Sequence, residues 1–160
     1  MSHAFAVQIG AKSNFPTVLL RILVADSGCS INDSLTALLS DFDGLSVFGC
    51  TQEPAKVLAL IATVHPDVVL LDLPAGNATG LVALKKIKRL PDAPVVIVLA
   101  QCDLAPLRLA AVAAGADHYL IKATECGCLQ EMLRDLQRKR AAVVQPLVRN
   151  REMGLPPKIA

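Results

Sequence analysis

Three charged residues each follow directly on an apolar run of the kind that forms a buried strand. The runs are RILVA, DVVLL and DHYLI, and the charged residues are Asp26, Asp72 and Lys122. A charge at the end of a buried strand costs free energy unless it is paired or used in chemistry. The simplest pairing is an ion pair between Asp72 and Lys122, with Asp26 capping the helix that follows it. The alternative is that Asp72 is a reactive group of a functional site.

The elements that must position these charges follow a regular order. From Arg21 onward, β-rich runs at 21–25, 45–49, 67–72, 93–100 and 117–122 alternate with stretches of helical periodicity, the last of which begins near Thr124. Strict alternation predicts an α/β doubly wound fold, in which helices cover both faces of a five-stranded parallel sheet. In such folds the functional site lies at the carboxyl ends of the strands, which is where Asp26, Asp72 and Lys122 fall.

Composition narrows the classes of protein that fit. The chain has 160 residues, of which 53% are hydrophobic and 3% aromatic, and its net charge of +2 is too small to indicate a nucleic-acid partner. The apolar runs fall short of the roughly 18 residues that a membrane span requires, and the amino-terminal segment does not resemble a signal peptide. We therefore expect a cytoplasmic protein with no membrane partner and with reduced cysteines.

Two segments, HPDVVLLDL and AGADHYLIKA, carry a resemblance to a known family. Together with the order of the elements, they resemble the receiver domain of bacterial two-component response regulators over about residues 21–138. The resemblance implies a flavodoxin-like, CheY-like sheet with strand order 2-1-3-4-5, counted along the chain. It leaves a flexible amino-terminal extension at 1–20 and a carboxy-terminal tail at 139–160.

Residue roles follow from the resemblance at the positions that match the family pattern. It implies that Asp72 is the phosphoacceptor, Lys122 the phosphate-binding lysine and Tyr119 the switch aromatic, while Asp26 is the first acid of the pair that holds Mg²⁺. A histidine kinase or another signalling protein would be the partner. The alternative from the residues alone, which favour it, is that Tyr119 is an ordinary half-buried strand residue.

Three positions depart from the family pattern. The loop after Asp72 has LPAG where the family usually has a Met-Pro pair, although Gly80 keeps the family spacing. The second acid is replaced by Ser27, and the hydroxyl residue after the fourth strand is replaced by Leu99. These changes predict weak Mg²⁺ binding and a degenerate site, in a stand-alone receiver-like protein that acts mainly through protein–protein contacts. The alternative is a single-domain response regulator that is still phosphorylated on Asp72.

Other chemistry has less support. A phosphohydrolase with an Asp nucleophile needs a second acid two residues later, where this chain has Pro74, so we expect no enzyme activity. Thiol or metal sensing is the outside alternative, because all five cysteines follow closely on strands, although their spacing is not that of a zinc site. The cysteines are Cys29, Cys50, Cys102, Cys126 and Cys128.

Contacts with partners are expected at the surface formed by the fourth helix, the fifth strand and the fifth helix, and above all at the fourth helix, Leu104 to Ala114. This helix is so apolar that one face should remain uncovered after the helix docks on the sheet, which predicts a homodimer or a protein partner, with Leu107 as an exposed position. Residues 139–160 are too few for a helix-turn-helix domain, so we expect no DNA-binding output.

Overall fold

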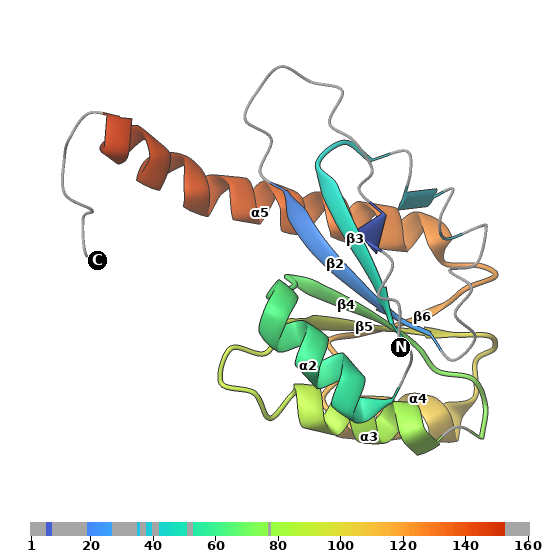
Figure 1. The fold of residues 1–160 in the computed structure, drawn as a ribbon. Coiled ribbons are helices and arrows are strands. Elements are labelled where there is room, and N and C mark those ends of the chain that lie inside the picture. Colours follow the sequence, from blue (N-terminus) through green and yellow to red (C-terminus); the bar gives the residue numbers. More distant parts are fainter. Residues whose placement is uncertain are drawn as a thin grey trace.

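The computed structural model (Figure 1) describes residues 6–7, 19–26, 35, 38–39, 42–50, 53–76 and 78–152. Five strands form a parallel sheet in the order β3-β2-β4-β5-β6, which is the predicted order 2-1-3-4-5. The strands are β2 (Leu20–Ala25), β3 (Leu45–Cys50), β4 (Val68–Asp72), β5 (Val95–Ala100) and β6 (His118–Ile121). The predicted doubly wound fold is confirmed.

A sixth strand, β1 (Ala6–Val7), pairs antiparallel with the outer edge of β3. The prediction of a flexible extension over residues 1–20 did not include it. Two residues are too few to display the alternation by which a strand is found in a sequence.

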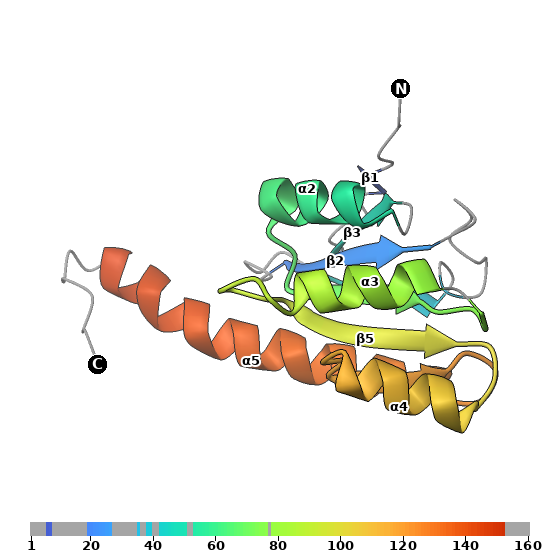
Figure 2. The ribbon, with the colours of Figure 1, turned by 90° about the horizontal axis from the view of Figure 1, so that it is seen from below.

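Helices cover both faces of the sheet (Figures 1 and 2). Three of them pack on one face, namely α2 (Pro54–Val64), α3 (Ala78–Ile87) and α4 (Ala105–Ala113), while α5 (Cys126–Glu152) crosses the other. Of the helix expected after β2, the structure describes Leu35, Leu38 and Leu39 as helical, and the rest lies outside the described residues. Among the described residues, no helix is long and apolar enough to span a membrane.

The strands are apolar on both sides because each face of the sheet is a separate core. Leu71 and Val98 point toward α2, α3 and α4, whereas their neighbours Leu70 and Leu99 point toward α5. This alternation puts even-numbered residues of β4 and odd-numbered residues of β5 on the α5 face.

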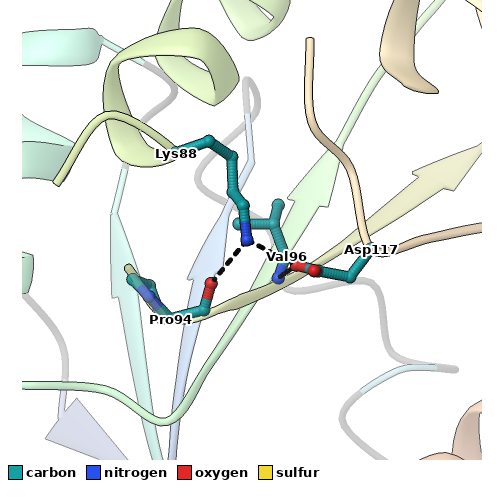
Figure 3. A network of polar contacts seen from close by, with 4 residues as sticks. All are labelled: Lys88, Pro94, Val96 and Asp117. Carbon is teal, nitrogen blue, oxygen red and sulfur yellow. Dashed lines mark hydrogen bonds and ion pairs between the residues drawn. The ribbon is translucent and has the colours of Figure 1, made fainter. Parts of the chain in front are cut away.

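A polar network at the amino-terminal edge of the sheet fixes the start of β6 (Figure 3). The Asp117 carboxylate accepts hydrogen bonds from the Val96 backbone N–H at 2.7 Å and from Lys88 Nζ at 2.9 Å. Lys88 Nζ also donates to the Pro94 carbonyl at 3.4 Å. By tying β6 to β5 and to the end of α3, these contacts hold the register that brings Lys122 to the opposite edge.

The last helix continues to Glu152, well beyond Arg138, where the resemblance to the receiver domain ends. Arg140 forms an ion pair with Asp67 at the start of β4, and Gln137 Nε2 donates to the Asp43 carbonyl at 2.8 Å. Residues 139–152 of the expected carboxy-terminal tail at 139–160 are therefore part of α5. A docked helix supplies the costly nucleus, and residues 138–145, RKRAAVVQ, contain neither glycine nor proline, so the helix propagates through them. The structure gives no reason for its continuation through Pro146.

Candidate functional site

The three strand-end charges meet at the carboxyl edge of the sheet. Asp72 is the last residue of β4, while Asp26 and Lys122 directly follow β2 and β6. In the parallel register, Leu71 lies opposite Ala25, so the side chains of the next residues, Asp72 and Asp26, project from the same face. The sequence-based expectation that these side chains share one edge is met.

An ion pair joins Lys122 to Asp72. Lys122 Nζ lies 2.7 Å from Asp72 Oδ1, and the two side chains are 23% and 13% exposed. Burial raises the pKa of the Asp72 carboxyl group, and the nearby Asp26 carboxylate raises it further, although Lys122 opposes both effects. One ammonium group therefore neutralises only part of the negative charge in this corner of the fold.

A small pocket of about 60 Å³ lies beneath these charges. Its apolar lining comes from the α5 face of the sheet, from Leu129 of α5 and from Leu35 of the helix after β2. The lining residues are Val24, Asp26, Leu35, Leu70, Asp72, Leu99, Leu120, Ile121, Lys122, Glu125 and Leu129.

Leu99 lies directly opposite Asp72 in the β4–β5 register and faces the same side. Its side chain is 5% exposed and belongs to the apolar core under α5. A leucine side chain has no hydrogen-bonding atom. The group beside Asp72 at this position is therefore a buried hydrocarbon.

Tyr119 lies on the other face of the sheet, opposite Val98 in the register, and is 8% exposed. Its hydroxyl group donates to the Cys102 carbonyl at 3.5 Å, and the guanidinium carbon of Arg108 lies 4.7 Å from its ring centroid. The expected half-buried tyrosine is thus a buried one, under α4.

Glu125 was not among the predicted site residues, although it lines the pocket. Its Oε2 accepts a hydrogen bond from the Ile121 backbone N–H at 2.6 Å, and its own N–H donates to the Ile121 carbonyl at 2.9 Å. These two bonds close the turn that carries Lys122. An acid directly before the last helix was the signal in the sequence, since helix starts favour acceptor side chains.

The donors for a divalent cation are limited. Asp26 and Asp72 supply carboxylate oxygens, the ligands that Mg²⁺ prefers, but no group of three or more His, Cys, Asp or Glu residues that could hold a metal occurs in the described part of the chain. Ser27 lies outside the described residues, as does Cys29. Cys102 and Cys128 are free, exposed thiols.

The surface of α4 is apolar. Leu104, Leu109 and Val112 are 41%, 69% and 59% exposed. Leu107, expected to be exposed, instead packs against the core that contains Tyr119, so this expectation was wrong by half a helical turn. The helix has eight uncharged residues around Arg108, and such a sequence gives no polar face by which its inner and outer sides could be told apart.

The chain is similar in sequence to known proteins. Residues 22–134 match the model of a family described as the response regulator receiver domain. A protein-glutamate methylesterase/protein-glutamine glutaminase of Caulobacter vibrioides is 30% identical over 139 residues, which are 86% of this chain and 40% of the relative. The response regulator GacA of Pseudomonas aeruginosa is 32% identical over 120 residues, which are 74% of this chain and 54% of GacA.

A solved structure gives the same fold. The CheY-like response regulator receiver domain protein of Methanospirillum hungatei superimposes with a TM-score of 0.60 at 22% identity, covering 78% of this chain and 98% of the other. The chain spans about half the length of the curated relatives that it matches.

Proposed function

Because the chain belongs to the response regulator receiver domain family, we propose that it is a receiver with a degenerate phosphorylation site, which acts mainly through protein–protein contacts. The observation that carries this proposal is the buried Leu99 side chain opposite Asp72. A phosphoryl group on Asp72 would meet hydrocarbon there instead of a hydroxyl donor.

Charge and hydrogen bonding indicate how large the defect is. A hydrogen bond to a charged group stabilises by about 1.5–3 kcal/mol, and Leu99 forfeits that contribution. Replacing a carboxylate by Ser27 removes a further charge at the metal site, and two unit charges about 4 Å apart interact by roughly 4 kcal/mol at an effective dielectric constant of 20. Desolvation offsets part of that figure, and the remainder still corresponds to a large loss of Mg²⁺ affinity.

Mg²⁺ belongs to the proposal as a weakly bound ion. Asp26 and Asp72 are the described residues that would hold it, and bound Mg²⁺ would neutralise charge on a phosphoryl group. Lys122 already pairs with Asp72 at 2.7 Å, so its ammonium group competes with a cation for the same carboxylate.

Protein contacts are the proposed route of signal output. The exposed side chains of Leu109 and Val112 on α4 support a homodimer or a complex with a histidine kinase or another signalling protein, because an apolar surface of this kind gains free energy when it is covered. A cytoplasmic location belongs to the same proposal.

One alternative has an observation in its favour. Asp26, Asp72 and Lys122 all remain at the sheet edge, which supports a receiver that is still phosphorylated on Asp72 by a histidine kinase. The two functions differ in whether Asp72 can be phosphorylated without the carboxylate that Ser27 replaces and the hydroxyl group that Leu99 replaces.

Magnesium affinity tests the proposal. The double variant Ser27→Asp with Leu99→Thr restores one ligand and one hydroxyl group, and calorimetric titration should show at least about a tenfold gain in Mg²⁺ affinity, which corresponds to 1.4 kcal/mol. Ala62→Asp with Leu99→Thr is the control for an added acid away from the metal site, because Ala62 is an exposed residue in the last turn of α2. Equal Mg²⁺ affinity of the wild type and the Ser27→Asp with Leu99→Thr variant would favour the alternative, a receiver that is still phosphorylated on Asp72.

A further inference from the structure

The only tyrosine of the chain is enclosed from two sides. The inner side of Tyr119 belongs to the apolar core that includes Val98 and Ala111. Its outer side is covered by Arg108, whose guanidinium carbon lies 4.7 Å from the ring centroid, within the roughly 6 Å range of a cation–π contact. Tyr119 as a whole is 8% exposed.

Arg108 is itself held in place. Its Nε donates to Asp103 Oδ1 at 2.9 Å, and its backbone N–H donates to the Leu104 carbonyl at 2.9 Å in the first turn of α4. Because the guanidinium group is planar, the bond to Asp103 also fixes the plane that stacks on the ring.

The loop before α4 contacts the tyrosine a second time. The carbonyl of Cys102 accepts a hydrogen bond from the Tyr119 hydroxyl group at 3.5 Å, one residue before Asp103. Burial raises the pKa of this phenol, as expected for a hydroxyl group that is kept from water, although the charge of Arg108 acts in the opposite direction. The helix thus contacts the face of the ring through Arg108, and the loop contacts the hydroxyl group through Cys102.

These contacts are separate from Asp72. The side chain opposite Asp72 is that of Leu99, which faces α5, whereas Tyr119 faces α4 on the other side of the sheet. Leu99 carries no polar group that could connect a change at Asp72 to the tyrosine. Arg108, Asp103 and Cys102 all belong to α4 and the loop that precedes it.

We propose that Arg108 is a positioning residue that holds Tyr119 in its buried orientation, so that the surface formed by α4 and β6 keeps one arrangement whatever the state of Asp72. This inference rests on the proposed function and deepens it, because it explains how the contact surface is kept ready without phosphorylation. Arg108 does so as a partly exposed residue of the same helix, with 39% of its side chain exposed.

Tyrosine fluorescence isolates the residue, because the chain has one tyrosine and no tryptophan. Quenching by acrylamide should be weak in the wild type. In Arg108→Ala we expect the quenching constant to rise at least about twofold, since a released ring exposes much of its large surface. Arg108→Lys keeps the charge without the planar group and should give an intermediate value.

The chain offers a matched control. The guanidinium carbon of Arg134 on α5 lies 5.2 Å from the ring centroid of Phe42, so Arg134→Ala removes the same kind of contact elsewhere. It should leave the quenching of Tyr119 unchanged. Circular dichroism on each variant separates release of the ring from unfolding, and Asp103→Ala, which removes only the anchor of Arg108, replaces Arg108→Ala if that variant does not fold.

Several results would overturn the inference. It is wrong if acrylamide quenches Tyr119 in folded Arg108→Ala, or in folded Asp103→Ala in its place, to the same degree as in the wild type. It is also wrong if Tyr119 is quenched as readily in the wild type as in the unfolded chain. Adding acetyl phosphate and Mg²⁺ to the wild type distinguishes the two proposals. A phosphoryl mass on Asp72 with unchanged quenching would refute the degenerate site alone, whereas unchanged quenching in the variants with no phosphoryl mass would refute only the role of Arg108.

Discussion

Replacing Leu99 by threonine restores a hydroxyl group opposite Asp72, and its effect on stability can be estimated. Truncating a buried leucine costs about 2–5 kcal/mol, and threonine keeps part of the volume, so about 2–3 kcal/mol of apolar packing is lost. The new hydroxyl group can donate to the Asp72 carboxylate, and a hydrogen bond to a charged group contributes about 1.5–3 kcal/mol. We therefore expect Leu99→Thr to lower the free energy of unfolding by only about 1 kcal/mol.

Urea denaturation measures this effect, and a double-mutant cycle isolates its cause. Leu99→Thr should cost about 1.5 kcal/mol more in an Asp72→Ala background than in the wild type, because the hydroxyl group then has no carboxylate acceptor. A cycle that closes to within about 0.5 kcal/mol would refute the reasoning, since sites that do not interact are additive to that degree.

Ile97→Thr is the matched control for burial. Ile97 lies on the same strand and the same face, is fully buried, and pairs in the register with Leu70 instead of an acid. Its hydroxyl group would lack a carboxylate partner, so the loss should be about 3 kcal/mol. A smaller loss for Ile97→Thr than for Leu99→Thr would show that the hydroxyl group gains nothing from Asp72.

Three further predictions concern other parts of the molecule. Gly115 has a φ of +98°, and an alanine Cβ there would lie 3.1 Å from Lys88 Cγ. Gly115→Ala should therefore lower the free energy of unfolding, measured by urea denaturation, by about 1–3 kcal/mol. An unchanged midpoint of urea unfolding would show that alanine causes no strain at this position. Burial raises the Asp72 pKa above 3.8, so the folded wild type binds more protons at this site than the unfolded chain does, and its stability relative to Asp72→Asn should fall as pH rises from about 4 through the folded-state pKa. Urea titrations of both proteins at about pH 4 and pH 7 should show this fall. The opposite trend would mean that Lys122 outweighs burial. Leu109→Glu places a charge on the apolar surface of α4 and should weaken self-association in concentration-dependent light scattering; a wild type that stays monomeric at high concentration would exclude the dimer.

The parts of the fold that repeat a local rule could be predicted from the sequence. Each of the five parallel strands is a short apolar run between helical stretches, and the parallel alternation places their ends at one edge. Asp26, Asp72 and Lys122 were found for that reason. The doubly wound topology follows from the same pattern, since a parallel sheet requires helical crossovers.

The rest depends on contacts between segments that are distant in the sequence. The ion pair of Arg140 with Asp67 holds α5 at the start of β4, and nothing local distinguishes Arg140 from its basic neighbours. The stacking of Arg108 on Tyr119 likewise depends on how α4 sits over β6. In α4 itself, the apolar residues on both sides of Arg108 did not show which side of the helix, that of Leu107 or that of Leu109, faces the sheet.

Chemical phosphorylation followed by intact-protein mass spectrometry tests the degenerate site most directly. After incubation with acetyl phosphate and Mg²⁺, we expect the wild type to gain no phosphoryl mass, the Ser27→Asp with Leu99→Thr variant to gain one, and the further change Asp72→Asn to abolish it. Labelling of wild-type Asp72 as readily as in the double variant would contradict the account and would identify an ordinary phosphorylated receiver.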